Sequence, residues 1–131
     1  MATAEGLMGV GVPAEVARRN GWEIVALTST GTTQGAAGGV MSGPGNKLVL
    51  ATPHASDGAF TLPSNADKGD EILVVNEHAS NSLDLFPATG HSIHKLSANG
   101  GTPVATAQSF HAIKVSATRW IGRLVATPAA T

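Results

Sequence analysis

The sequence contains no cysteine, and its aromatic residues, three Phe and two Trp, make up only 4% of the chain. Without cysteine, the chain can form neither a disulfide, nor a thiolate nucleophile, nor a Cys-ligated zinc site. The scarcity of aromatic side chains leaves little bulk for the core of a monomer. We therefore expect part of the apolar surface, such as Val74 and Leu85 or Phe110 and Ile113, to be buried against another copy of the chain.

Charge is also scarce, since charged residues make up 13% of the chain, with eight basic against nine acidic side chains. No broad positive field is expected, so neither nucleic acid nor a membrane surface is an expected partner. No run approaches the roughly 18 apolar residues of a membrane-spanning helix. The basic pair Arg18 and Arg19 follows the apolar residues of the N-terminus instead of preceding them, which argues against a secretory signal. We expect synthesis as a soluble protein in a cytoplasm.

The longest run of large apolar residues, 72–75, lies in the segment 69–93, around which the other predicted strands are arranged. Three of its four residues are β-branched, and turn residues bound it, which predicts a strand buried on both faces. After a polar break, Leu83 and Leu85 alternate with Ser82, Asp84 and Phe86, and the segment stops at Pro87. This pattern predicts two antiparallel strands and the beginning of a third at His91.

Further strands are predicted on both sides of this segment, and turn signals recur roughly every 8 to 12 residues, which is typical of a sandwich or barrel. A length of 131 residues suits one domain. The prediction is an all-β fold, a compact antiparallel β-sandwich or barrel whose body spans residues 22–131. Residues 29–45 form a long loop that either crosses one end of the body or acts as a linker. The other predicted strands are 22–28, 47–52, 59–62, 91–96, 104–108, 109–116 and 118–126.

Residues 1–21 are predicted to form a separate N-terminal extended arm with one short helix. Pro13 suits the first position of a helix, and Asn20 with Gly21 would end it. A helix of less than two turns is not stable alone in water, so it must dock on its own sheet or on a partner. The candidate docking residues of the arm are Leu7, Val10, Val12, Pro13 and Val16.

The ionisable side chains do not have the spacing of a metal site or of a catalytic site. His91 and His94 are three residues apart on a predicted strand, where odd spacing sends side chains to opposite faces. We interpret the histidines as exposed turn or edge residues and the acidic cluster as turn chemistry, and we predict no metal, no cofactor and no catalytic residue. These residues are the five histidines 54, 78, 91, 94 and 111 and the carboxylates Asp57, Asp67, Asp70, Glu71 and Asp84.

Neither a hydrolase motif nor a phosphate loop is present. No G-x-S-x-G occurs, and Lys47 is followed by Leu48 where a phosphate loop needs Ser or Thr. Trp120 with Arg119 and Arg123 could stack a base, but the pattern is more typical of a solvated rim beside a partly buried Trp. These patterns predict a protein that is not an enzyme.

Residues 57–120 nevertheless resemble a module of tailed-bacteriophage virion proteins. The matching elements are Leu62-Pro63, Gly69-Asp70, the strand 72–76 that ends in Asn, Phe86-Pro87, the element 90–93, Ala98-Asn99 and Trp120. The N-terminal sequence GVPAEVARRNG is similar to a G-x-P-A-E-x-A segment that often precedes the module. The resemblance implies a small all-β structural protein, assembled as a homotrimer, with no catalytic residues to transfer.

Together, the resemblance, the small size and the low charge predict a capsid decoration (cement) protein on the virion surface. It would bind the lattice of the major capsid protein and stabilise the head as a homotrimer. Two alternatives stay open: a head-fibre or receptor-binding module that recognises a host surface glycan, and a small hydrolase that acts on surface polysaccharide. Copy number separates the decoration protein from the fibre, because a cement protein is present in hundreds of copies per particle and a fibre in few.

Overall fold

The computed structural model describes residues 21–94 and 97–126, which form two β-sheets and one 3-10 turn, η1 (Ala37–Gly39). The strands are β1 (Trp22–Thr28), β2 (Asn46–Thr52), β3 (Gly58–Thr61), β4 (Glu71–Asn76), β5 (Leu83–Phe86), β6 (Ser92–Ile93), β7 (Thr102–Val104), β8 (Gln108–Ser116) and β9 (Arg119–Ala126). Most lie within a residue or two of a predicted strand. The all-β prediction is therefore confirmed. The predicted arm and its helix lie outside the described residues, except for Gly21.

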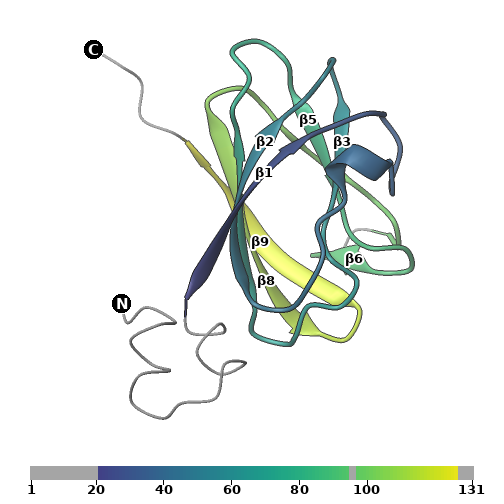
Figure 1. Cartoon of the computed structure of the whole chain (residues 1–131). Helices are drawn as coiled ribbons and strands as arrows, with labels where there is room; N and C mark the ends of the chain where they lie inside the picture. The colour runs from purple at the N-terminus through teal and green to yellow at the C-terminus, as the bar shows by residue number, and fades with distance from the viewer. Residues whose placement is uncertain (1–20, 95–96, 127–131) are drawn as a thin grey trace.

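The larger sheet has six strands in the order β1-β2-β4-β8-β9-β6 (Figure 1). β1, β2 and β4 are mutually parallel, whereas β8 runs antiparallel to both β4 and β9. The short β6 pairs in parallel with the beginning of β9, at Arg119 and Trp120 only. The prediction of purely antiparallel pairing was wrong, because the sheet is mixed.

The smaller sheet has three strands in the order β3-β5-β7, with β3 parallel to β5 and β5 antiparallel to β7. Consecutive strands from β2 to β5 alternate between the two sheets, so neighbours in each sheet are separated by a strand of the other. This alternation explains the parallel pairs, because a chain that returns through the opposite sheet re-enters in the same direction. The predicted antiparallel pair of 72–75 with 83–86 was therefore wrong, since β4 and β5 belong to different sheets.

One apolar core lies between the two sheets. The larger sheet supplies Val49, Ile72 and Val74, and the smaller sheet supplies Phe60 and Leu85, all without exposed surface. Alternation along each strand of the larger sheet sends one set of side chains to this inner face and the other set to an outer face. The arrangement is a β-sandwich with a shared core.

The long loop between β1 and β2 crosses one end of the sandwich. Val40 forms a parallel bridge with Thr61 of β3, and the N–H of Met41 donates to the carbonyl of Thr61 at 2.9 Å. The loop therefore visits the smaller sheet before it returns to β2. Of the two interpretations of residues 29–45, the crossing is confirmed.

Two expectations about burial were wrong. In the run 72–75, Leu73 and Val75 are only half-buried, because β4 presents them on the outer face. The strand is therefore not buried on both faces. The expected contacts with another copy were Val74 and Leu85 or Phe110 and Ile113, but the first three lie in the core of the single chain and only Ile113 is half-buried. Surface available to another copy must come from other residues.

Candidate functional site

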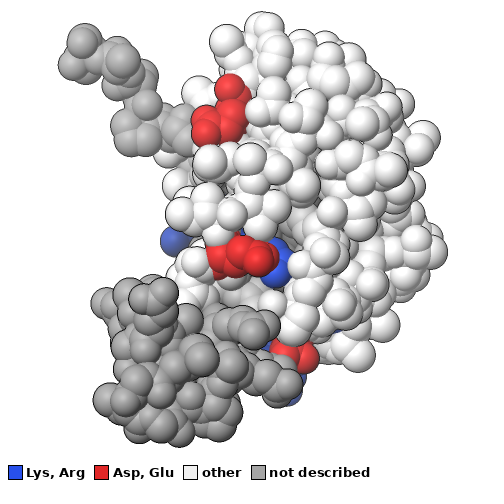
Figure 2. All heavy atoms as spheres, viewed as in Figure 1, with Lys and Arg blue, Asp and Glu red and all other residues white. Residues whose placement is uncertain are grey.

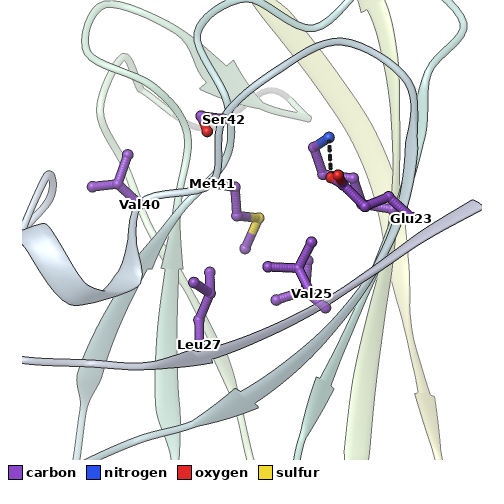
Figure 3. A pocket seen from close by; sticks show the side chains of 8 residues that line it. Glu23, Val25, Leu27, Val40, Met41 and Ser42 are labelled. Atoms are coloured by element: carbon purple, nitrogen blue, oxygen red, sulfur yellow. Dashed lines mark hydrogen bonds and ion pairs between the residues drawn. The ribbon is translucent and has the colours of Figure 1, made fainter. Parts of the chain in front are cut away.

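A small pocket lies between β1 and the segment 40–42, on the inner side of the larger sheet. Its volume is about 270 Å³ and its lining residues are Glu23, Val25, Leu27, Val40, Met41, Ser42, Lys47 and Val49. Figure 3 shows the side chains of Met41, Val25 and Leu27 directed into this space. The volume lies just below the range of roughly 300 to 1,000 Å³ that is typical of small-molecule sites.

The polar groups of this pocket are dominated by one ion pair. Lys47 Nζ lies 3.1 Å from Glu23 Oε1, and its side chain is 4% exposed against 63% for that of Glu23. The glutamate thus neutralises a nearly buried ammonium at the border with solvent. Ser42 is not hydrogen-bonded to a general base in the described part of the chain. The pocket can accept a small apolar group, and it has no catalytic arrangement.

A contact between Ser29 and His54 has the residue types of a nucleophile and a base. The hydroxyl of Ser29 accepts the backbone N–H of His54 at 2.9 Å and lies 2.5 Å from its Nδ1. Ser29 is buried, however, and its hydroxyl is occupied by this one neighbour. The contact joins the end of β1 to the turn after β2. No sequence motif indicated it, because the two residues are brought together only by the parallel pairing of these strands.

The carboxylates Asp57 and Asp84 interact across the smaller sheet. Burial, and then the negative charge of Asp57, raise the pKa of Asp84 above its ordinary value. A carboxyl group with a raised pKa beside a second carboxylate is the pairing that glycoside hydrolysis uses. Asp57 nevertheless accepts a hydrogen bond from Ser82 in an exposed turn, and neither carboxylate lines the pocket described above.

The histidines occupy separate structural positions. His54 and His94 are exposed, as predicted, whereas His78, His91 and His111 are half-buried. Two of them stabilise the backbone: His78 Nδ1 accepts the N–H groups of Ser80 and Asn81, and His94 Nε2 accepts that of Gly122. Over residues 21–94 and 97–126, no group of three or more His, Asp or Glu side chains could hold a metal ion.

The acidic segment 67–71 is a turn, as predicted. The carboxylate of Asp70 accepts the backbone N–H groups of Gly45 and Asp67 at 2.8 and 2.7 Å, and Gly69 adopts a φ of 95°. Glu71 points to the outer face, where its Oε1 lies 2.9 Å from His111 Nε2. Asp70 therefore joins the segment before β2 to the turn before β4, and Glu71 pairs with His111 on the outer face.

Charged side chains do not gather into a nucleic-acid surface on the face that Figure 2 shows, where they form a few small separate groups. Arg119 is half-buried and Arg123 is exposed on the outer side of β9, while Trp120 points to the inner side and is completely buried. The expectation of a partly buried Trp on a solvated rim was wrong, because β6 and the core cover the indole. It cannot stack a base.

Sequence reasoning missed a buried lysine in the core. Lys114 Nζ donates to the carbonyl of Ala66 at 2.8 Å and lies 5.8 Å from the centre of the Trp120 ring. Burial, and then the nearby ammonium of Lys114, lower the pKa of His91. The available signal was the register of 110–114, which places Lys114 on the same face as Phe110 and Ala112. We assign this lysine to the stability of the core, through a hydrogen bond and a cation–π contact.

The outer face of the larger sheet is a further candidate interaction surface. Ile24, Leu48 and Leu73 are side by side on β1, β2 and β4, and Ala26, Leu50 and Val75 form the next row. None of these six side chains is fully buried. The face also carries the Glu71–His111 pair, and both arginines of β9 lie at its border. A contiguous apolar area of this kind is typical of a protein–protein contact.

The predicted docking residues Leu7, Val10, Val12, Pro13 and Val16 lie outside the described residues, so the structure does not test them. No helix among residues 21–94 and 97–126 has the length and apolar character needed to cross a membrane. Searches of protein-family models, curated proteins and solved structures find no match to this chain.

Proposed function

We propose that this chain is a capsid decoration (cement) protein of a tailed bacteriophage, which binds the lattice of the major capsid protein as a homotrimer and has no enzymatic activity. The resemblance of residues 57–120 to phage virion modules is the starting point. The observation that supports the proposal most is the half-exposed apolar face formed by β1, β2 and β4. A protein designed for repeated symmetric contacts needs such a surface.

The candidate sites of the described chain also favour binding over catalysis. Ser29 is buried, neither Asp57 nor Asp84 lines the pocket beside Glu23, and the carboxylate of Glu23 is paired with Lys47. Ser29, Asp57 and Glu23 each have a structural partner in the described chain. The surface of the molecule is therefore a better candidate for the functional region than any cluster of reactive side chains.

The arm is the proposed anchor on the capsid. In the sequence it directly precedes β1, which is an edge strand of the larger sheet. Each buried apolar side chain of the arm contributes roughly 1 to 2 kcal/mol of transfer free energy before ordering costs are subtracted. Three arms on one trimer bind more tightly than one, because the first contact raises the effective concentration of the others.

Deletion of residues 1–21 tests the anchor. The expected product is a soluble oligomer that melts cooperatively but no longer binds capsids that lack the native protein. A full-length variant with Leu7→Asp, Val10→Asp and Val16→Asp should lose binding in the same way, whereas Thr3→Asp in the same arm should retain it. Occupancy is measured by co-sedimentation with capsids and quantitative gel analysis.

Two results would count against the proposal. If the truncated chain decorates capsids with unchanged occupancy, the arm is not the anchor and the docking surface lies on the β-sandwich. If mass spectrometry of purified virions finds only a few copies per particle, the protein is not a decoration protein, and the head-fibre or receptor-binding alternative replaces it.

A further inference from the structure

The most exposed large apolar side chains are concentrated at two edges of one sheet. Among the described residues, four of the five such side chains lie on β1 or β9, and only Val40 lies elsewhere. Ile24 of β1 is 69% exposed, while Leu124 and Val125 of β9 are 45% and 40% exposed. The exposure is greatest where the sheet has no further long strand.

The outer edge of β1 carries free backbone groups in the described structure. β1 pairs with β2 on one side only. The N–H of Ser29, just after β1, donates toward β2, to the carbonyl of Thr52. Because backbone direction alternates along a strand, the N–H and C=O groups of Ile24 and Ala26 point away from β2. A strand edge of this kind is a template for pairing with another chain.

The second half of β9 has a similar edge. β6 covers β9 only at Arg119 and Trp120, and the N–H of Gly122 is the last to be used there, by His94 Nε2. The same alternation places the N–H and C=O groups of Leu124 and Ala126 on this edge, beyond the end of β6. No other strand of the described chain pairs with them.

We propose that copies of this chain associate head to tail, with the β1 edge of one copy paired to the 121–126 edge of the next. The two edges lie on opposite sides of the same sheet, so one molecule cannot pair them with each other. They have similar lengths, seven residues in β1 and six in the open part of β9. When two copies pair, the open edge of one copy covers the open edge of the other, and the apolar side chains of the two edges become buried.

Self-pairing of either edge is less favourable than head-to-tail contact. Glu23, the one charged residue of β1, is already paired with Lys47 on the inner face. Pairing β9 with a second β9 brings Arg123 of the two copies together. Self-pairing of either edge also leaves the other edge of each molecule open. A heterologous contact forms a closed ring when the rotation between copies allows it, and three copies form the smallest ring beyond a dimer.

Head-to-tail pairing deepens the homotrimer of the proposed function, and its test uses the purified full chain without capsids, so either proposal can fail alone. The wild-type chain should elute with three times its chain mass of 13.2 kDa in size-exclusion chromatography with light scattering. Ile24→Lys blocks the β1 edge and Leu124→Lys blocks the β9 edge, because a lysine on an edge strand opposes pairing. Both variants should elute as monomers, and Ser64→Lys, which changes an exposed side chain in the turn after β3, should keep the wild-type mass.

Mixing the two variants identifies the mode of pairing. Ile24→Lys retains a functional β9 edge and Leu124→Lys retains a functional β1 edge, so an equimolar mixture should form a heterodimer of twice the chain mass. A wild-type monomer at tens of micromolar would overturn the proposal. So would one variant alone that keeps the wild-type mass, because self-pairing of one edge would then hold the oligomer. A mixture that stays monomeric while both variants melt cooperatively would overturn it as well.

Discussion

Gly122 on β9 is a position where a single methyl group should destabilise the whole sandwich. An ideal Cβ there would lie 2.1 Å from the carbonyl oxygen of His111 and 2.7 Å from Cε1 of Phe110. Ordinary contacts of a Cβ begin at 3.4 Å, so the backbone of β8 would have to move by more than 1 Å. The ring of Phe110 covers this glycine, an arrangement that protects a glycine within a sheet.

The size of the effect follows from two opposing terms. Overpacking costs about 1 to 3 kcal/mol, and the upper end applies because backbone must move. Replacing glycine returns about 0.4 to 1 kcal/mol by restricting the unfolded chain. Gly122→Ala should therefore lower the free energy of unfolding by about 2 kcal/mol, which corresponds to a Tm decrease of roughly 6 to 10 °C for a chain of this size.

Thermal unfolding followed by circular dichroism measures this change, at one protein concentration because association alters the apparent stability. Gly21→Ala is the matched control, since no heavy atom lies within 4 Å of its ideal Cβ. It should melt within about 2 °C of the wild-type chain. If Gly122→Ala also melts within that interval, the close approach of β8 and β9 at Gly122 is wrong.

Three further results are expected. Asp70→Ala should lower the free energy of unfolding, measured with denaturant, by about 2 to 4 kcal/mol, because the N–H groups of Gly45 and Asp67 lose a charged acceptor. Asp70→Asn should lower it less, and an unchanged unfolding midpoint for both variants would contradict the assigned hydrogen bonds. Burial, and then Lys114, lower the pKa of His91 in the folded chain, so the imidazole of His91 is protonated in the unfolded chain first as the pH falls, and stability is lost below about pH 6.5. His91→Gln should flatten the decline of Tm between about pH 7.5 and pH 5, and a decline identical to that of the wild-type chain would refute this reasoning. Chelator should leave the Tm unchanged, since the described residues hold no metal-binding group; a fall of several degrees that calcium or zinc reverses would show a missed site.

Local patterns predicted the strands and turns well because both depend on nearby residues. The apolar run 72–75 became β4, and the acidic segment 67–71 became a turn around Gly69. Pairing could not be predicted in the same way. A polar break after β4 is compatible with a hairpin, but β4 instead pairs with β2 and β8, and β5 joins the other sheet. Pairing depends on contacts between distant segments, which periodicity does not encode.

Burial and side-chain partners were also beyond local patterns. An apolar run alone does not distinguish a strand that is covered on both faces from a strand whose outer face is partly exposed. The sequence therefore predicts Leu73 and Val75 in the interior, where the structure does not place them. The contact of Ser29 with His54 joins residues 25 apart. Lys114 offered a signal in its register, but its contact with Trp120 depends on how β8 and β9 pack.

The order of the strands has a consequence for how the chain folds. β8 and β9 form the one close hairpin of the larger sheet, joined by a turn at 117–118, whereas β4 lies more than 30 residues before its antiparallel partner β8. Nucleation is therefore expected near the C-terminal hairpin, because closing a short loop costs the least entropy. During synthesis on the ribosome, β1, β2 and β4 emerge before β8, the strand that joins them to β9. The larger sheet can form only after residues 108–126 have been made, so its folding follows translation of that hairpin.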